Sequence, residues 1–199
     1  MPDSSPESDL EARAQRHHYR SLTPEEYEGL NHFRADWADI AAEADNRFFI
    51  LGSFAEGDVD RVNQLKDHIN RETGDDAVAY RMDDFLPDTD VILHPILKFK
   101  LIADDSHYVL GVCEHDQGGA LIEHGLLIES RSYIDKTHIL KRTYPPEREK
   151  EQYSWMQTFG VFEIFEYYDQ LYEWETVPEY ERQIEDLVEE LLRESHAEE

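Results

Sequence analysis

One carboxylate stands out because of its surroundings. Glu123 is the single acid in the apolar stretch 120–128 (ALIEHGLLI), and it follows a polar turn that contains Gly118 and Gly119. A carboxyl group near the mouth of an apolar pocket has a raised pKa, which suits a nucleophile or a general acid. The two glycines allow a backbone to approach a ligand without a side chain between them. The alternative is that Glu123 lies on the solvent face of its helix and does no chemistry.

A second candidate is the loop 52–57 (GSFAEG), which joins an apolar run to an amphipathic helix. The N-terminus of that helix would offer free N–H groups and a favourable dipole to a phosphate or a ribose. The loop has neither the Gly-Lys-Ser/Thr of a P-loop nor the G-x-G-x-x-G fingerprint of a dinucleotide site. It could equally be an ordinary turn between a strand and a helix. The candidate ligand-binding residues here are Gly52, Ser53 and Phe54.

Three aspartates complete the candidate site. Asp83 and Asp84, in the segment 81–85 (RMDDF), follow an apolar run, where a carboxylate could accept both hydroxyls of a ribose; a solvated acidic pair is the alternative. Asp116 lies in the same polar turn as the two glycines. The single cysteine, Cys113, excludes an internal disulfide, and the histidines lack zinc-site spacing. We therefore expect no metal and no cofactor.

The elements that would position these residues alternate between two periodicities. Short apolar runs predict buried parallel strands, and the segments between them have the spacing of amphipathic helices. This alternation predicts a flavodoxin-like or Rossmann-like parallel sheet of about five strands, in the order 2-1-3-4-5, with helices on both faces. Ligands of such sheets bind beyond the carboxyl ends of strands 1 and 3, where the loops 52–57, 81–85 and 113–119 would meet. The four clearest strands are expected at 47–54, 76–82, 107–113 and 137–144.

The chain divides into a short leader and one domain. Residues 1–22 are rich in Ser, Pro and charge and predict a flexible leader. Residues 23–199 predict a single α/β domain. Within it we expect an N-terminal helix over 23–45, a nucleotide-binding-like core over 47–144, and a C-terminal strand and helix over 159–195. The alternating segment 161–168 (VFEIFEYY) is the expected edge strand.

Composition restricts the partners. The chain has 46 acidic against 19 basic residues and a formal charge of -27, so a surface for nucleic acid is not expected. No run approaches the ~20 apolar residues of a membrane span, and we expect a soluble cytoplasmic protein. Arg outnumbers Lys by 13 to 6 and the acids are dispersed along the chain. In this respect the composition resembles that of a haloarchaeal cytoplasmic protein.

Two stretches together carry a resemblance to a known family. FFILGSFAEGDVDRVNQLKDHI, followed by LIADDSHYVLGVCEHDQGGALIEHGLLIE, resembles the nucleoside 2-deoxyribosyltransferase and TIR-like nucleotide-binding α/β domains over about residues 47–130. The shared features are a small-residue loop after strand 1, a helix ending in Ala-Asp, and a Gly-rich turn followed by Glu and then Gly. The resemblance implies that Glu123 is the carboxylate that attacks or stabilises the anomeric carbon of a nucleoside or of NAD. Asp116 lies seven residues before Glu123, whereas the transferases have an Asp six residues before theirs.

Two functions remain open from the sequence. One is cleavage or transfer of an N-glycosidic bond of a nucleoside, nucleotide or NAD-like molecule, with Glu123 as the key carboxylate. The other is a non-catalytic module that senses a nucleotide or binds a protein. A homo-oligomer is also among the expected assemblies, because a stripe of aromatic residues near the C-terminus is more typical of a core or a subunit interface than of a base-stacking platform. The stripe consists of Phe159, Phe162, Phe165, Tyr167, Tyr168, Tyr172 and Trp174.

Overall fold

A single parallel sheet organises the protein. The computed structural model describes residues 6–17, 21–41, 44–53, 59–74, 76–85, 93–116 and 120–197. All four strand pairings in the sheet are parallel, and the strand order is β2-β1-β3-β4-β5. The predicted fold class and order are therefore confirmed. The strands are β1 (Asn46–Gly52), β2 (Ala77–Tyr80), β3 (Tyr108–Cys113), β4 (Thr137–Arg142) and β5 (Leu171–Trp174).

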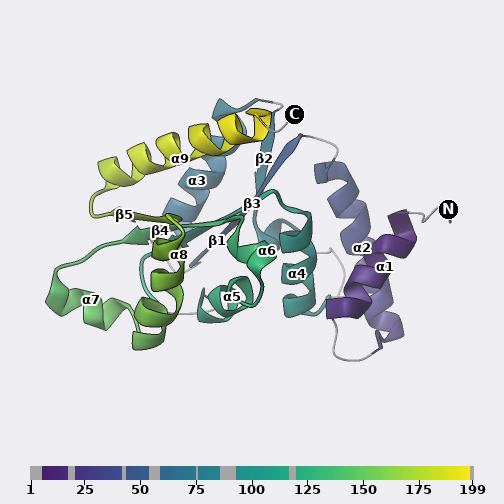
Figure 1. Cartoon of the computed structure of the whole chain (residues 1–199). Helices are drawn as coiled ribbons and strands as arrows, with labels where there is room; N and C mark the ends of the chain where they lie inside the picture. The colour runs from purple at the N-terminus through teal and green to yellow at the C-terminus, as the bar shows by residue number, and fades with distance from the viewer. Residues whose placement is uncertain are drawn as a thin grey trace.

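Helices cover both faces of the sheet, as Figure 1 shows. One face packs against α3 (Val59–Glu72) and α9 (Val177–Ala197) and forms one of the two apolar cores. The opposite face forms the other core with the remaining helices, because alternate strand residues point to opposite sides. These helices are α4 (Pro95–Asp105), α5 (Ala120–Leu127), α6 (Arg131–Ile134) and α8 (Glu163–Tyr167), with the π-helix Gln157–Phe162 leading into α8.

Two N-terminal helices, α1 (Pro6–His17) and α2 (Pro24–Ala41), lie beside α4 (Figure 1). In α1, Leu10 and Ala14 are buried, and His17 Nε2 lies 2.7 Å from Asp104 Oδ2 of α4. Arg13 forms a second ion pair with Asp105. The expectation of a flexible leader over 1–22 therefore does not hold for residues 6–17, since a docked amphipathic helix buries apolar side chains there.

The predicted edge strand at 161–168 is helical instead. The π-helix and α8 occupy this segment, and β5 begins at Leu171. Val161, Phe162 and Phe165 are buried. Their spacing of three and four residues fits a helix as well as the alternating pattern fits a strand, and a short apolar run does not separate the two.

The remaining elements lie close to their expected positions. The segment after the polar turn forms two short helices, α5 and α6, and α7 (Pro146–Gln152) follows β4. In the C-terminal helix α9, Ile184, Leu187, Val188 and Leu191 are buried. Across the described ranges, no helix has the length and apolar character that a bilayer span requires.

Candidate functional site

The candidate site lies where the parallel strands end. β1 ends at Gly52 and its neighbour β3 ends at Cys113, with β2 on one side and β4 on the other. The chain crosses to opposite faces of the sheet after β1 and after β3, because α3 covers one face and α5 the other. In open parallel sheets the crevice formed by such divergent connections is where ligands bind. The side chains at these strand ends are therefore the candidates for contact with a ligand.

Glu123 lies in the first turn of α5 and is half-buried. Burial raises the pKa of its carboxyl group to about 7. Within the described residues, no hydrogen bond or ion pair reaches this carboxylate. Burial is the largest cause of the raised pKa of the Cys113 thiol, and the negative charge of Glu123 is the second. The Glu123 carboxylate therefore lies close to the end of β3. Glu123 is thus a half-buried acid near the carboxyl edge of the sheet, and its charge has no partner in the part of the chain that the structure describes.

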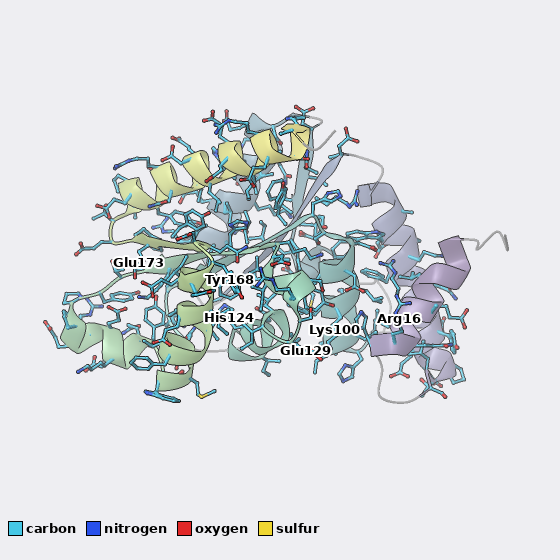
Figure 2. The ribbon with its side chains drawn as sticks, viewed as in Figure 1. Arg16, Lys100, His124, Glu129, Tyr168 and Glu173 are labelled. Atoms are coloured by element: carbon cyan, nitrogen blue, oxygen red, sulfur yellow. The ribbon has the colours of Figure 1, made fainter. Side chains whose placement is uncertain are left out.

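The residue after Glu123 anchors α5 to the sheet. His124 Nε2 lies 3.2 Å from Cys113 Sγ, and His124 Nδ1 lies 3.3 Å from Gln157 Nε2 of the π-helix. All three side chains are buried, and Figure 2 labels His124 on α5. Burial lowers the pKa of His124 to about 4 and raises that of the Cys113 thiol, so both are neutral at pH 7. This buried polar chain holds α5, and hence Glu123, against the end of β3.

The sequence offers no reason to connect Cys113 with His124. No recognised motif uses a Cys and a His at this spacing, and only the packing of α5 on β3 brings them together. A neutral buried thiol is a poor nucleophile, because the thiolate is the reactive form. The pair is therefore structural. At its other end, α5 is followed by Glu129, whose Oε2 lies 2.6 Å from Lys100 Nζ of α4; both are labelled in Figure 2.

A second group missed by sequence reasoning lies at the ends of β3 and β4. Glu114 is buried, and its Oε2 accepts a 2.6 Å hydrogen bond from Arg142. The Arg142 guanidinium lies 5.2 Å from the ring centres of both Tyr144 and Trp174. Burial alone would lower the pKa of Arg142. The hydrogen bond with Glu114 and the negative charge of Glu114 outweigh this effect, so the pKa of Arg142 is raised. The pair cross-links neighbouring strands on the side of the sheet where Trp174 packs with α9.

Tyr153 and Lys141 stabilise the opposite side of the same strand ends. The Tyr153 hydroxyl lies 2.9 Å from the carbonyl oxygen of Cys113 and 2.7 Å from that of Arg142, so it joins the last residues of β3 and β4. Lys141 is buried and forms ion pairs of 2.7 Å with Glu149 and 2.9 Å with Glu173. These contacts cross-link the strand ends beside the candidate site.

Close packing against α3 explains why the residue at the end of β1 is a glycine. A Cβ atom on Gly52 would lie 2.5 Å from Val62 Cγ2 of α3 and 3.1 Å from the carbonyl oxygen of Val112 in β3. Only glycine allows α3 to approach the sheet this closely. Ser53 follows at the end of β1 and is half-buried. The third residue predicted in this loop, Phe54, lies outside the described residues.

The predicted ribose-binding aspartates already have cationic partners. Asp84 Oδ2 accepts hydrogen bonds of 2.6 Å from Lys66 Nζ and 2.7 Å from the backbone N–H of Arg81. Asp83 Oδ2 accepts a 2.8 Å hydrogen bond from the Arg81 guanidinium. They form part of the short 3₁₀ helix Met82–Phe85 that follows β2. Their carboxylates connect β2 to α3, which accounts for their position without a ligand.

The polar turn before α5 is described only in part. The backbone N–H of Asp116 donates a 2.9 Å hydrogen bond to the carbonyl oxygen of Gln152, at the end of α7. Gly118 and Gly119 lie outside the described residues. In the ranges that the structure does describe, no group of three or more His, Cys, Asp or Glu side chains is arranged to hold a metal ion. Of the predicted site residues, Gly52, Ser53, Asp116 and Glu123 thus lie around the ends of β1 and β3, and Asp83 and Asp84 lie beyond β2.

Comparison with known proteins gives a family and no activity. The model of one family, described as "Family of unknown function (DUF8170)", matches residues 15–152. The matched region extends from the end of α1 to the end of α7 and includes β1 to β4 and Glu123. It covers more than half of the 199 residues. No curated protein matches the chain.

Proposed function

The chain belongs to the DUF8170 family, and we propose that it binds a nucleoside, nucleotide or NAD-like molecule at the carboxyl edge of its sheet and cleaves or transfers the N-glycosidic bond with the help of Glu123. The observation that carries this proposal is the state of the Glu123 carboxyl group. It is partly removed from water, its pKa is raised to about 7, and no cation in the described part of the chain compensates its charge. The crevice beyond β1 and β3 is the position at which parallel sheets bind nucleotides.

The chemistry of N-glycosidic cleavage needs such a carboxylate. The bond between C1′ and the base nitrogen breaks, and its electron pair leaves with the base. Positive charge then develops at C1′ until water or an acceptor hydroxyl adds there and gives up its proton. An ionised carboxylate without a partner gains most from a cation that forms beside it, so the interaction is stronger in the transition state than with the neutral sugar. Glu123 in its ionised form would supply this stabilisation.

The neighbouring residues have a positioning role in this proposal. His124 and Cys113 hold α5 against the end of β3, and Tyr153 joins the ends of β3 and β4. A stabilising charge acts at full strength only when its position is set before the reaction begins. The buried contacts beneath Glu123 therefore support an electrostatic role. A non-catalytic nucleotide-binding module would use the same crevice, with Glu123 contributing one polar contact.

The test compares two variants that each remove one carboxylate. Glu123→Gln keeps the shape of the side chain and removes its charge, and Glu166→Gln removes an exposed carboxylate of α8 as the matched control. The proteins are incubated with NAD and with a deoxynucleoside, base release is followed by chromatography, and binding is followed by calorimetric titration. We expect the parent and Glu166→Gln to release base, and Glu123→Gln to bind while losing turnover by orders of magnitude.

The two functions give different results in this experiment. Binding without base release by the parent, with an affinity change of about 1 kcal/mol or less in Glu123→Gln, identifies the binding module. Neither binding nor base release with any nucleotide, including molecules that mass spectrometry finds in the purified protein, contradicts both. Base release that is equal in the parent and in Glu123→Gln would show that Glu123 does not support the reaction.

A further inference from the structure

A group of exposed apolar side chains gathers on one segment of the chain. Trp155, Met156, Phe159, Tyr167 and Tyr168 all lie in or next to the π-helix and α8, and we call them the aromatic surface. Their exposed fractions are 70%, 63%, 52%, 78% and 37%, and they make up five of the seven large hydrophobic residues that are exposed in the described part of the chain. Trp, Tyr, Phe and Met are the residue types enriched at protein interfaces. This clustering indicates a contact surface rather than scattered surface residues.

The exposed side chains of the aromatic surface stand beside two hollows. Phe159 lines two hollows, one on each side of it, of about 480 Å³ and 500 Å³. The first hollow lies toward α7 and is lined by Trp155 and Lys150 among others. The second lies toward α6 and is lined by Tyr167 and Glu163 among others. Figure 1 shows α7 and α8 on the side of the molecule away from α1 and α2, so the N-terminal helices do not cover this surface.

Charge is distributed unevenly between the two hollows. Lys150 and Arg148 lie on α7 beside the first hollow, and Glu163 and Glu166 lie on α8 beside the second. All four side chains are exposed, and within the described ranges none of them forms an ion pair. The two cations of β4, Lys141 and Arg142, are by contrast paired with acids. α7 also carries Glu147, Glu149 and Glu151, so the α7 side of the aromatic surface is mixed in charge, whereas the α8 side presents Glu163 and Glu166; Phe159 lies between the two sides.

We infer that the aromatic surface binds the same surface of a second copy of this chain, in a two-fold symmetric dimer. In such a dimer, the part of the surface on one side of the axis in one copy meets the part on the other side of the axis in the second copy. With the axis close to Phe159, the α7 side of one copy faces the α8 side of the other, and Lys150 lies opposite Glu163 twice. The ridge formed by Trp155 can then enter the second hollow of the partner, and Tyr167 the first.

The charge pattern favours a second copy over an unrelated partner. Lys150 and Glu163 have opposite charges and lie on opposite sides of Phe159. A half turn therefore brings Lys150 of one copy opposite Glu163 of the other, whereas an unrelated partner would need its own acid and base at matching positions. The general repulsion between two acidic proteins opposes this dimer. Salt weakens that repulsion, because the screening length falls to ~3 Å near 1 M, while burial of aromatic side chains is not weakened by salt.

The first test measures mass in solution. Light scattering after size-exclusion chromatography in molar KCl should give about 47 kDa for the full chain, twice the chain mass of 23.5 kDa. Phe159→Asp should give the monomer, because it places a charge at the centre of the interface. Ile96→Asp, which changes an exposed apolar residue of α4 outside the aromatic surface, should remain a dimer. Circular dichroism checks that both variants are folded, which is expected because both residues are exposed.

The second test separates specific pairing from net charge, at the lowest salt concentration in which the parent remains folded. Glu163→Lys changes the net charge from -27 to -25, since a positive charge replaces a negative one, so a general charge effect would strengthen the dimer. Pairing with Lys150 predicts the opposite: a dissociation constant raised at least several-fold. The double variant Lys150→Glu/Glu163→Lys keeps the parent's net charge and should restore the parent's affinity. A monomeric parent, a dimer that Phe159→Asp leaves intact, or a double variant without recovery would each overturn the inference.

Discussion

His124 Nε2 lies 3.2 Å from Cys113 Sγ, and this contact joins the last turn of α5 to the last residue of β3. Both side chains are buried, and burial keeps both neutral, with the pKa of His124 lowered to about 4. The neighbouring residue in the chain is Glu123, whose carboxyl group lacks a partner among the described residues. One residue of α5 thus fixes the helix, and the preceding one presents its charge to the carboxyl edge of the sheet.

The contact between His124 and Cys113 should contribute measurably to stability. His124→Ala removes a buried ring and leaves the Cys113 thiol and the Gln157 amide without their partner, so we expect a loss of about 2–4 kcal/mol in the free energy of unfolding. Urea unfolding in molar KCl measures it. A double-mutant cycle with Cys113→Ala should show a coupling of about 0.5–1.5 kcal/mol. Additive single effects would mean that the two side chains do not interact.

The raised pKa of Glu123 predicts a specific dependence of stability on pH. In the folded protein the pKa is about 7, against an ordinary value of 4.5, so the folded state holds this proton more tightly. The stabilisation is complete below pH 4.5 and is lost as the pH rises through 7. Glu123→Gln should therefore match the parent at low pH and exceed it above pH 7, on the order of 1–3 kcal/mol.

The exposed carboxylate of Glu166 provides the control for this effect. Glu166→Gln should show no difference from the parent that depends on pH, because its side chain is exposed in the folded protein. Thermal unfolding across the pH range compares the three proteins. If Glu123→Gln is no more stable than the parent at pH 8, the carboxylate is hydrated or has a partner. A variant that gains stability while losing turnover would be typical of a functional residue.

The close approach of α3 to the sheet predicts that Gly52 tolerates no side chain. Gly52→Ala places a Cβ 2.5 Å from Val62 Cγ2 and should cost about 1–3 kcal/mol of stability through overpacking. Val62→Ala removes the clashing methyl groups. The double variant should therefore lose less stability than the sum of the two single variants, as measured by urea unfolding. Full additivity would show that the clash is relieved elsewhere, by a shift of α3.

Stability should rise with salt concentration. A net charge of -27 on 199 residues repels itself in the folded state, and screening becomes effective over short distances only near molar salt. We expect the melting temperature to increase steadily between about 0.1 M and about 3 M KCl. An unchanged melting temperature would contradict the proposal that the acidic surface is adapted to high salt. Sodium chloride at the same ionic strength should behave in the same way, since the effect depends on screening.

The sequence was sufficient to predict the sheet, except for the position of its fifth strand. Strands buried on both faces need continuous apolar runs such as the one at 48–51, and helices that cover a sheet need an apolar stripe. Both patterns are local, and the handedness of the crossover connections then leaves few arrangements. For this reason the parallel sheet and the order 2-1-3-4-5 could be predicted before any contact was known. Glu123 could also be singled out from local sequence, because a single acid in an apolar stretch can be recognised from its neighbours.

Other features depended on contacts between distant segments. Whether 161–168 is a strand or a helix is decided by where Phe162 and Phe165 are buried, since both periodicities fit the same short run. Residues 6–17 become ordered through Leu10 and two ion pairs to α4, which a local reading of polar composition does not reveal. In both segments, the free energy of packing against another element decides the local structure.

The partners of the candidate site were also decided only by the tertiary structure. Cys113 meets His124, and Glu114 meets Arg142, because neighbouring strands and the helix above them end at the same edge of the sheet. Asp83 and Asp84, which the sequence suggested for a ribose, are instead paired with Arg81 and Lys66. Hydrogen bonds and ion pairs act over a few ångströms, so their partners follow from the fold. Local sequence patterns determined the first four strands of the sheet; packing determined the structure of 6–17 and 161–168 and which side chains meet.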